Sequence, residues 1–140
     1  MSGFTVSSLQ LTHAAVMTML AAAIGKAEQM AQPQCIVVVD ASGETLGEIR
    51  MTGAKYLSRK SARSKALTAA SIGAESTAIP EPVRPLIGLA TGGSVTGLPG
   101  GLPIRMEGQL VGGIGVGSGS GDQDIEVAKA ALDAIGADPV

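Results

Sequence analysis

The stretch that decides the fold is GGIGVGSGSGDQD, residues 112–124, in which glycine occupies every second position from Gly113 to Gly121. A dinucleotide-binding loop needs glycines at relative positions one, three and six, and no frame here has glycine in the sixth place. The stretch also lacks the lysine of a P-loop. The period of two that is left is the period of a β-strand. We therefore predict a strand with one bare face, which a helix, another subunit or a ligand can approach closely.

Two β-hairpins are predicted around this strand. The run CIVVVD at residues 35–40 is a continuous, mostly β-branched strand, and the turn sequence DASG leads from it into ETLGEIRM. The second hairpin pairs LPIRM with QLVGGIGVG across the turn Glu107-Gly108. Residues 90–101, ATGGSVTGLPGG, indicate a loop or an edge strand.

Three main helices are expected beside these strands. Apolar spacing of three and four predicts a helix over residues 8–30, and a second helix follows over about 55–72. The last helix is predicted to start near Asp122 or Asp124, since acids are favourable at a helix N-terminus. The order α-β-β-α-β-β-β-α predicts a single α+β domain over residues 1–140, with an antiparallel sheet of about five strands flanked by helices.

Composition argues against several classes of partner. The chain has 10 Lys and Arg against 12 Asp and Glu, a formal net charge of −2, one Phe, one Tyr and no Trp. Without a cationic surplus or aromatic stacking side chains, we expect no nucleic-acid partner. The longest apolar segment, AVMTMLAAAIG, is too short to cross a bilayer, and the N-terminus has no cationic leader. We therefore expect a cytoplasmic protein with no membrane partner.

Cations gather in one part of the sequence. Six of the ten lie within residues 50–65, where there is no acid, whereas residues 122–138 hold five acids against Lys129. This asymmetry indicates either a solvated helix face or complementary surfaces within an oligomer.

The second predicted helix has two unlike sides. At ~100° per residue, one side holds Tyr56, Arg59, Lys60 and Arg63, and Lys65 lies on the other among serine, alanine and threonine. In such a place, either the lysine stem runs along the packed face or the ammonium enters a cleft. A lysine in a cleft binds a carboxylate or, with a lowered pKa, serves as a base or Schiff-base amine.

His13 is the only histidine and Cys35 the only cysteine. An intrachain disulfide, a cysteine-rich zinc site and a site built from several histidines of one chain are therefore excluded. His13 is either a partly exposed helical residue or a haem ligand, alone or in a site shared across subunits. Cys35, at the start of an apolar strand, is interpreted as a buried small hydrophobe.

Several segments together resemble one family. In chain order they are VVVDASGETLGEIRMTGA, YLSRKSARSKALTAA, PGGLPIRMEGQLVGGIGV and GSGDQDIEVAKAAL. They resemble the GlcG/HbpS-like family of haem-binding or haem-degrading proteins, which includes the C-terminal domain of PduO-type corrinoid adenosyltransferases. The residues that match the family pattern are Asp40, Gly43, Arg50, Gly53, Ala54, Lys65, Thr68, Ala69, Pro99, Gly100, Gly101, Pro103, Ile104, Gly108, Gly113, Gly115 and Asp124.

The resemblance implies a compact domain with a profilin-like antiparallel sheet flanked by helices, assembled as a homo-oligomer. It supports Arg50 and Lys65 as functional residues. It also makes haem the candidate cofactor and haem or a corrinoid candidate ligands.

We expect an oligomeric protein that binds a small anionic molecule, of carboxylate type or else haem or a corrinoid, near Arg50, Lys65 and the loop from Pro99 to Gly101. The alternative is a catabolic enzyme, an isomerase, lyase or hydratase acting on a small carboxylate or keto acid. In that case Arg50 would anchor the carboxylate and Lys65 would be the base or electrophile. A further alternative is a structural or regulatory subunit without ligand.

Other residues are candidates for contact with the ligand or a metal. His13 is the candidate metal ligand, as an axial ligand of haem. The candidate ligand-binding residues are Tyr56, Pro99, Gly100, Gly101, Gly115, Gly117 and Ser118.

Overall fold

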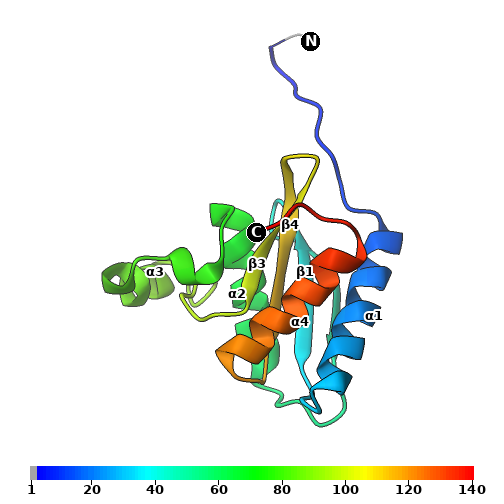
Figure 1. The fold of residues 1–140 in the computed structure, drawn as a ribbon. Helices are drawn as coiled ribbons and strands as arrows, with labels where there is room; N and C mark the ends of the chain where they lie inside the picture. The colour runs from blue at the N-terminus through cyan, green and yellow to red at the C-terminus, as the bar shows by residue number, and fades with distance from the viewer. Residues whose placement is uncertain (1–2) are drawn as a thin grey trace.

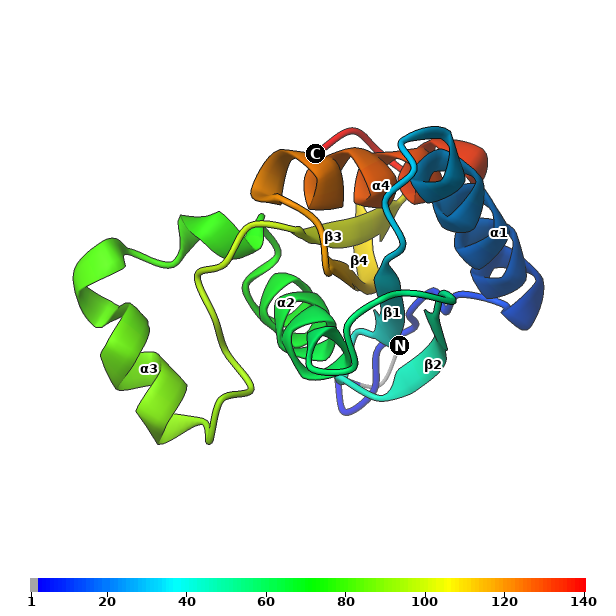
Figure 2. The ribbon, with the colours of Figure 1, turned by 90° about the horizontal axis from the view of Figure 1, so that it is seen from below.

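Four antiparallel strands form one sheet with helices on both faces in the computed structural model, which describes residues 3–140 (Figure 1). The strand order is β2-β1-β4-β3. Helices α1 and α4 cover one face of the sheet and α2 covers the other (Figure 2). Along the chain the elements are α1 (His13–Gln29), β1 (Cys35–Asp40), β2 (Thr45–Arg50), α2 (Ser58–Ile72), the short 3-10 turns η1 (Ser76–Ala78) and η2 (Glu81–Val83), α3 (Arg84–Ala90), β3 (Gly101–Met106), β4 (Gln109–Gly117) and α4 (Gly121–Ala134).

The α+β class and the antiparallel sheet are confirmed, but the sheet has four strands where about five are predicted. The segment between α3 and β3, expected as a loop or an edge strand, is a loop. Side chains of α2 hold it: Ser64 Oγ donates to Gly93 O at 2.7 Å, and Thr96 N donates to Thr68 Oγ1 at 2.9 Å. Because these side chains take up its backbone groups, the segment needs no neighbouring strand.

The bare face of β4 packs against helix α2. A Cβ on Gly113 would lie 2.3 Å from the carbonyl oxygen of Ala66, and a Cβ on Gly115 would lie 1.9 Å from that of Ala62. No side chain fits at such distances, so the helix backbone comes this close only because these residues are glycines. The predicted bare strand face is confirmed, and of its three possible occupants a helix is the one found.

The opposite face of β4 is filled by side chains. Ile114 and Val116 alternate with the glycines and are fully buried against α1 and α4. Met19 of α1 and Val127 of α4 are equally buried in the same cluster. Burial of each large apolar side chain contributes about 1.5–3 kcal/mol. Strand β4 therefore has one face without side chains, which packs on α2, and one face of buried apolar side chains, which packs on α1 and α4.

Both hairpins form where the sequence predicts them. In the first turn, the Ser42 backbone N–H donates to Asp40 Oδ1 at 2.9 Å, and Gly43 has a φ of 87°. In the second, Glu107 and Gly108 have φ values of 53° and 78°. A two-residue hairpin turn whose twist matches that of its strands needs positive φ at both positions.

Helices α1 and α2 begin later than the apolar spacing predicts, whereas α4 begins at Gly121, next to the predicted Asp122. Helix α1 begins at His13 because the Thr12 side chain caps it, and α2 begins at Ser58. Helix α4 follows Ser120, which forms a capping box with Gln123. Within residues 3–140, none of the helices has both the length and the apolarity needed to cross a bilayer.

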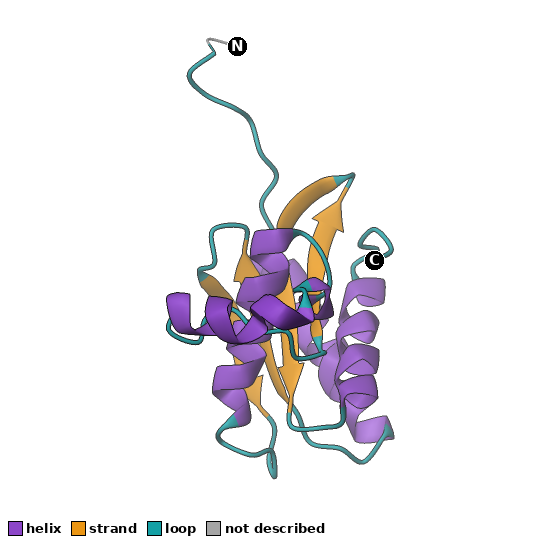
Figure 3. Ribbon diagram, turned by 90° about the vertical axis from the view of Figure 1, so that its left-hand side faces the viewer, coloured by secondary structure: helices purple, strands orange, loops and turns teal. Residues whose placement is uncertain are grey.

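The segment between α2 and β3 extends to one side of the sheet (Figures 1 and 3). It contains η1, η2 and α3, and no residue of α3 is buried. Its side chains Leu86 and Leu89 are 65% and 81% exposed. This segment therefore contributes little to the core.

Candidate functional site

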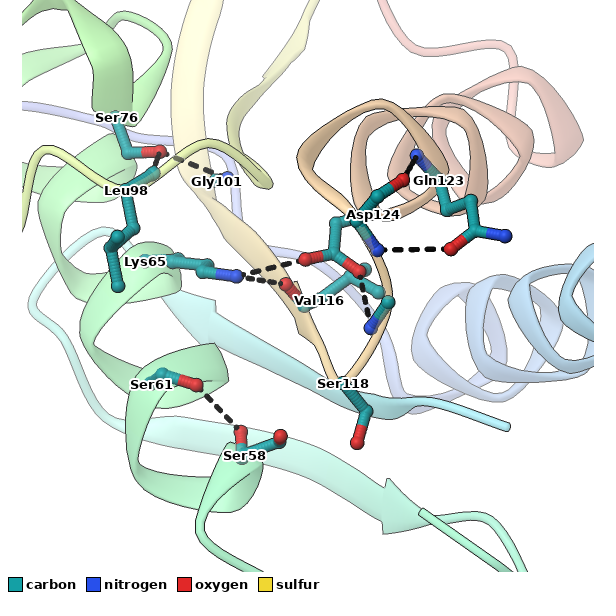
Figure 4. Close-up of polar contacts among 12 residues, drawn as sticks. Ser58, Ser61, Lys65, Ser76, Leu98, Gly101, Val116, Ser118, Gln123 and Asp124 are labelled. Carbon is teal, nitrogen blue, oxygen red and sulfur yellow. Dashed lines mark hydrogen bonds and ion pairs between the residues drawn. The ribbon is translucent and has the colours of Figure 1, made fainter. Parts of the chain in front are cut away.

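Lys65 points inward from α2 and ends between β4 and the start of α4 (Figure 4). Its side chain is only 6% exposed. Nζ donates to Val116 O at 2.8 Å and to Asp124 Oδ2 at 3.1 Å. An ammonium has three N–H donors, so these two acceptors leave one donor uncommitted. Of the two orientations that the sequence allows, the structure has the one in which the ammonium enters the interior.

Asp124 pairs with this lysine from the first turn of α4, where an acid also suits the helix dipole. Its Oδ1 accepts a hydrogen bond from the Gly119 N–H at 3.1 Å. Burial raises the pKa of the Asp124 carboxyl above its ordinary value of 3.8, and the Lys65 ammonium offsets part of that rise. The side-chain amide of the fully buried Gln34 also lies near the Asp124 carboxyl and lowers its pKa slightly. The two groups do not meet hydrogen-bonding geometry.

A pocket of about 290 Å³ opens beside the Lys65–Asp124 pair. Two lysines, one aspartate and three serines are among its lining residues, which gives it a net charge of +1. The serines come from two elements, the start of α2 and the loop after β4. We call it the Lys65 pocket, and it is lined by Lys55, Ser58, Ser61, Lys65, Leu98, Pro99, Ser118, Gly119, Gly121 and Asp124.

Of the loop from Pro99 to Gly101, Pro99 lines the Lys65 pocket, whereas Gly100 and Gly101 do not. Gly100 has a φ of 117°, and a Cβ on it would lie 2.9 Å from Asp124 Cβ. The Gly101 N–H donates to Ser76 Oγ at 3.0 Å, which fixes the end of the loop. Glycine therefore lets this loop lie directly against the buried ion pair.

Ser118 lines the Lys65 pocket, whereas the glycines before it, Gly115 and Gly117, pack against α2. Ser118 has a φ of 101°, which is uncommon for a residue with a side chain, and its Oγ accepts a hydrogen bond from Lys55 N at 2.9 Å. Gly115 and Gly117 face the backbone of α2, at Ala62 and Ser58, and do not line the pocket. Their contribution is to let α2 carry Lys65 close to the sheet.

Arg50 and Lys65 do not share a pocket, which corrects the expectation that one pocket holds both cations. Arg50 is exposed on β2, where its Nε donates to Ala54 O at 3.1 Å and its side chain borders a groove beside Pro33 and Met51. The sheet order explains the separation. Strand β2 lies at the edge and β1 stands between it and β4, on which Lys65 ends.

Tyr56 and His13 also lie outside the Lys65 pocket. Tyr56 is 68% exposed on the cationic side of α2. His13 is the exposed first residue of α1, and Met17, one turn later on the same helix, is 67% exposed. Within residues 3–140, no group of three or more His, Cys, Asp and Glu side chains is placed to hold a metal ion.

The sequence did not identify Asp124 as the partner of Lys65, nor Ser58 and Ser61 as pocket residues. The sequence does hold a signal for the pairing of Asp124 with Lys65, because these are two of the few charged residues that match the family pattern. Nothing in the sequence marks the serines, which are ordinary residues for an exposed helix start.

Comparison with known proteins decides the family. The family model described as "Haem degrading protein HbpS-like" matches residues 11–133. The chain belongs to the HbpS-like family. Among relatives, corrinoid adenosyltransferase PduO of Citrobacter freundii is 37% identical over 131 residues, which cover 90% of this chain and 37% of PduO. The chain therefore spans little more than a third of the length of this relative.

Two solved structures are similar to this HbpS-like chain over nearly its whole length. Protein ORFY of Klebsiella pneumoniae is 30% identical with a TM-score of 0.88, covering 96% of this chain and 97% of ORFY. The PduOC:heme complex is 28% identical with a TM-score of 0.86, covering 93% of this chain and 98% of PduOC. The family resemblance and the fold class are therefore confirmed.

Haem is the group that these similarities raise, and it needs an axial ligand and apolar cover. His13 and Met17 are side chains of axial type one turn apart on α1, with the exposed Ala14 and Ala21 on the same stretch of helix. Cys35 is buried and its Sγ donates to Lys55 O. The α1 residues fit haem as a surface site that this chain covers from one side, so a second copy would have to cover the other.

Proposed function

We propose that this HbpS-like chain is a binding protein for a small carboxylate, held in the Lys65 pocket. The observation that supports this best is the Lys65 ammonium itself. It is buried, it is fixed by Val116 O and Asp124, and it keeps one N–H donor for a third acceptor. A buried, pre-positioned donor loses little freedom when a ligand arrives.

The rest of the pocket suits a carboxylate. Its net charge of +1 is balanced by one carboxylate group. The Ser58 and Ser118 hydroxyls can donate to the second carboxylate oxygen or to a neighbouring hydroxyl or keto group, and the Ser61 hydroxyl can do so by turning from its long 3.3 Å bond to Ser58 O. Lys55 lies exposed at the rim, where it attracts anions from solution.

Binding is better supported than the enzymatic alternative. A Schiff base or a general base needs an unprotonated amine. Asp124 at 3.1 Å and Val116 O at 2.8 Å instead both accept hydrogen bonds from Lys65 Nζ, so its N–H groups are engaged as donors. In this arrangement Lys65 is a hydrogen-bond donor.

Calorimetric titration with pyruvate and glycolate tests the proposal. Lys55→Gln and Ser61→Ala each remove a wall group without breaking the buried pair, and each should weaken binding about tenfold, the loss expected for a charge-assisted hydrogen bond. Lys129→Gln, an exposed cation on α4, is the matched control and should bind like the parent. Absence of saturable binding, or equal weakening by the control, would contradict the proposal.

A second ligand, haem, is supported by His13 and Met17 on one exposed part of α1 and by the haem in the similar PduOC structure. We propose that His13 would supply one axial ligand with Met17 packed beside the ring, and that a second copy of the chain would cover the other side. A Soret titration of the parent, His13→Ala and Met17→Leu, with the mass of the complex measured by sedimentation, tests this. A saturable shift retained in both variants would rule out this site.

Three expectations from the sequence stay predictions. They are the homo-oligomer, the cytoplasmic location and the lack of a nucleic-acid partner. Of these, the homo-oligomer is tested by the same sedimentation measurement, made with and without haem.

A further inference from the structure

The start of α2 borders a second groove, which the Lys65 pocket does not use. The two share no lining residue, because Lys65 and the groove residues leave different sides of the helix. Three cations and one carboxylate line the groove and give it a net charge of +2. We call it the α2 groove, and it is lined by Glu48, Tyr56, Leu57, Arg59, Lys60 and Arg63.

These cations stand where a helix disfavours them. The N-terminal end of a helix carries a partial positive charge, so acids stabilise it and cations destabilise it. Helix α2 nevertheless has Arg59 and Lys60 in its first turn, has no acid there and has no side-chain cap at Leu57. Its first N–H groups are taken by turn bonds, such as Lys60 N to Leu57 O at 3.1 Å. The first backbone N–H groups of α2 are therefore hydrogen-bonded, but the helix places no acid beside its positive end.

The cations of the α2 groove have weak partners or none. Arg59 Nη2 lies 3.8 Å from Glu48 Oε1, and these side chains are 60% and 42% exposed. Such an exposed, long ion pair contributes little to stability. Among residues 3–140, the one acceptor of Arg63 Nη1 is the neutral hydroxyl of Thr45. Lys60 forms no side-chain hydrogen bond or ion pair within residues 3–140.

We propose that the α2 groove binds the phosphate group of a small organic phosphate. A phosphate monoester has a charge between about −1.5 and −2 at neutral pH and three acceptor oxygens, which match a groove of charge +2 with three cationic side chains. Two arginines are suited to bidentate contact with phosphate. The exposed Tyr56 ring offers an apolar face to the organic part of the ligand.

Amide chemical shifts during titration with phenyl phosphate test this site. Saturable shifts should appear at residues 56–63, and Arg59→Gln and Arg63→Gln should each weaken binding about tenfold. Lys129→Gln should leave the affinity unchanged. Succinate serves as the dicarboxylate comparison and should bind more weakly. Shifts elsewhere, no saturation, equal loss in Lys129→Gln, or succinate binding as tight as phenyl phosphate would each overturn the proposal.

Lys60→Glu adds a readout that the pyruvate and glycolate tests of the Lys65 pocket do not share. An acid in the first turn should raise the melting temperature by about 1–4 °C while weakening phenyl phosphate binding at least tenfold. Pyruvate binding in the Lys65 pocket should be unaffected. A variant that gains no stability and binds phenyl phosphate like the parent would overturn the assignment of this groove to an anion.

Discussion

Helices α2 and α4 lie against opposite faces of β4 and are built differently. Helix α4 rests on aliphatic side chains such as Ile114, and it begins with a capping box and two acids. Helix α2 rests on glycine backbone, begins with cations and no cap, and buries the charged Lys65. The α4 side follows the ordinary rules of helix stability, and the α2 side departs from them. Such departures concentrate at functional sites, which supports the two binding sites proposed on the α2 side.

The largest effect expected is that of Lys65→Met. It leaves the Asp124 carboxylate buried without its partner, which should lower the free energy of unfolding by about 3–5 kcal/mol at neutral pH. Urea denaturation measures this. The double variant Lys65→Met/Asp124→Leu, which removes both charges, should return close to the parent. A loss below about 1 kcal/mol in the single variant would show that the α2 side carries no special cost.

Acid should reduce the cost of Lys65→Met. Burial already raises the pKa of Asp124, and loss of the ammonium removes the main influence that lowers it. A carboxyl whose pKa is raised in the folded state favours folding at low pH, and that contribution is lost as the pH rises through the folded pKa. The deficit relative to the parent should therefore shrink from pH 7 towards pH 4, the ordinary range of the carboxyl, in urea titrations at each pH. A constant deficit would contradict the pairing.

Two neighbouring residues of β4 compare the faces directly. Gly115→Ala adds one methyl group against the backbone of α2 and should cost about 3 kcal/mol, since a helix must move. Ile114→Val removes one methylene on the other face and should cost about 1 kcal/mol. Thermal and urea unfolding of both variants measures the difference. Equal costs would mean that the close approach of α2 is not a constraint.

Substitutions at the starts of α4 and α2 should change the free energy of unfolding by smaller amounts. Ser120→Ala removes half of the α4 capping box and should cost about 1 kcal/mol, measured by urea denaturation. The opposite sign is expected at the start of α2, where Lys60→Glu should gain a few tenths of a kcal/mol or more. If Ser120→Ala and Lys60→Glu destabilise the chain alike, the start of α2 is not less favourably built than the start of α4.

The sequence predicts what depends on local pattern. The glycine period gives the bare strand face, and Glu107-Gly108 gives the hairpin turn. For the segment before β3 the sequence indicates either a loop or an edge strand, because Ser64 and Thr68, which hold it as a loop, are far away in the chain.

The residues of the site also divide into those that a local sequence pattern indicates and those that depend on contacts between distant parts of the chain. The small-residue surroundings of Lys65 predict either a stem along the packed face or an ammonium in a cleft, and the structure has the inward ammonium. Its partner Asp124 depends on where α4 meets α2 across β4, and the distance of Arg50 from the pocket depends on the order of strands. Neither is present in any local pattern. The resemblance to the HbpS-like family gave the fold, but it did not separate Arg50 from Lys65.

The most direct test is the location of pyruvate on the protein, followed by amide chemical shifts during titration. Saturable shifts at Ser61, Ser118 and Gly119 are the result expected if the Lys65 pocket binds a carboxylate, with about tenfold more pyruvate needed in Lys55→Gln and no change in Lys129→Gln. Shifts that are absent there, or confined to the exposed side of α1 or to the α2 groove, would contradict it.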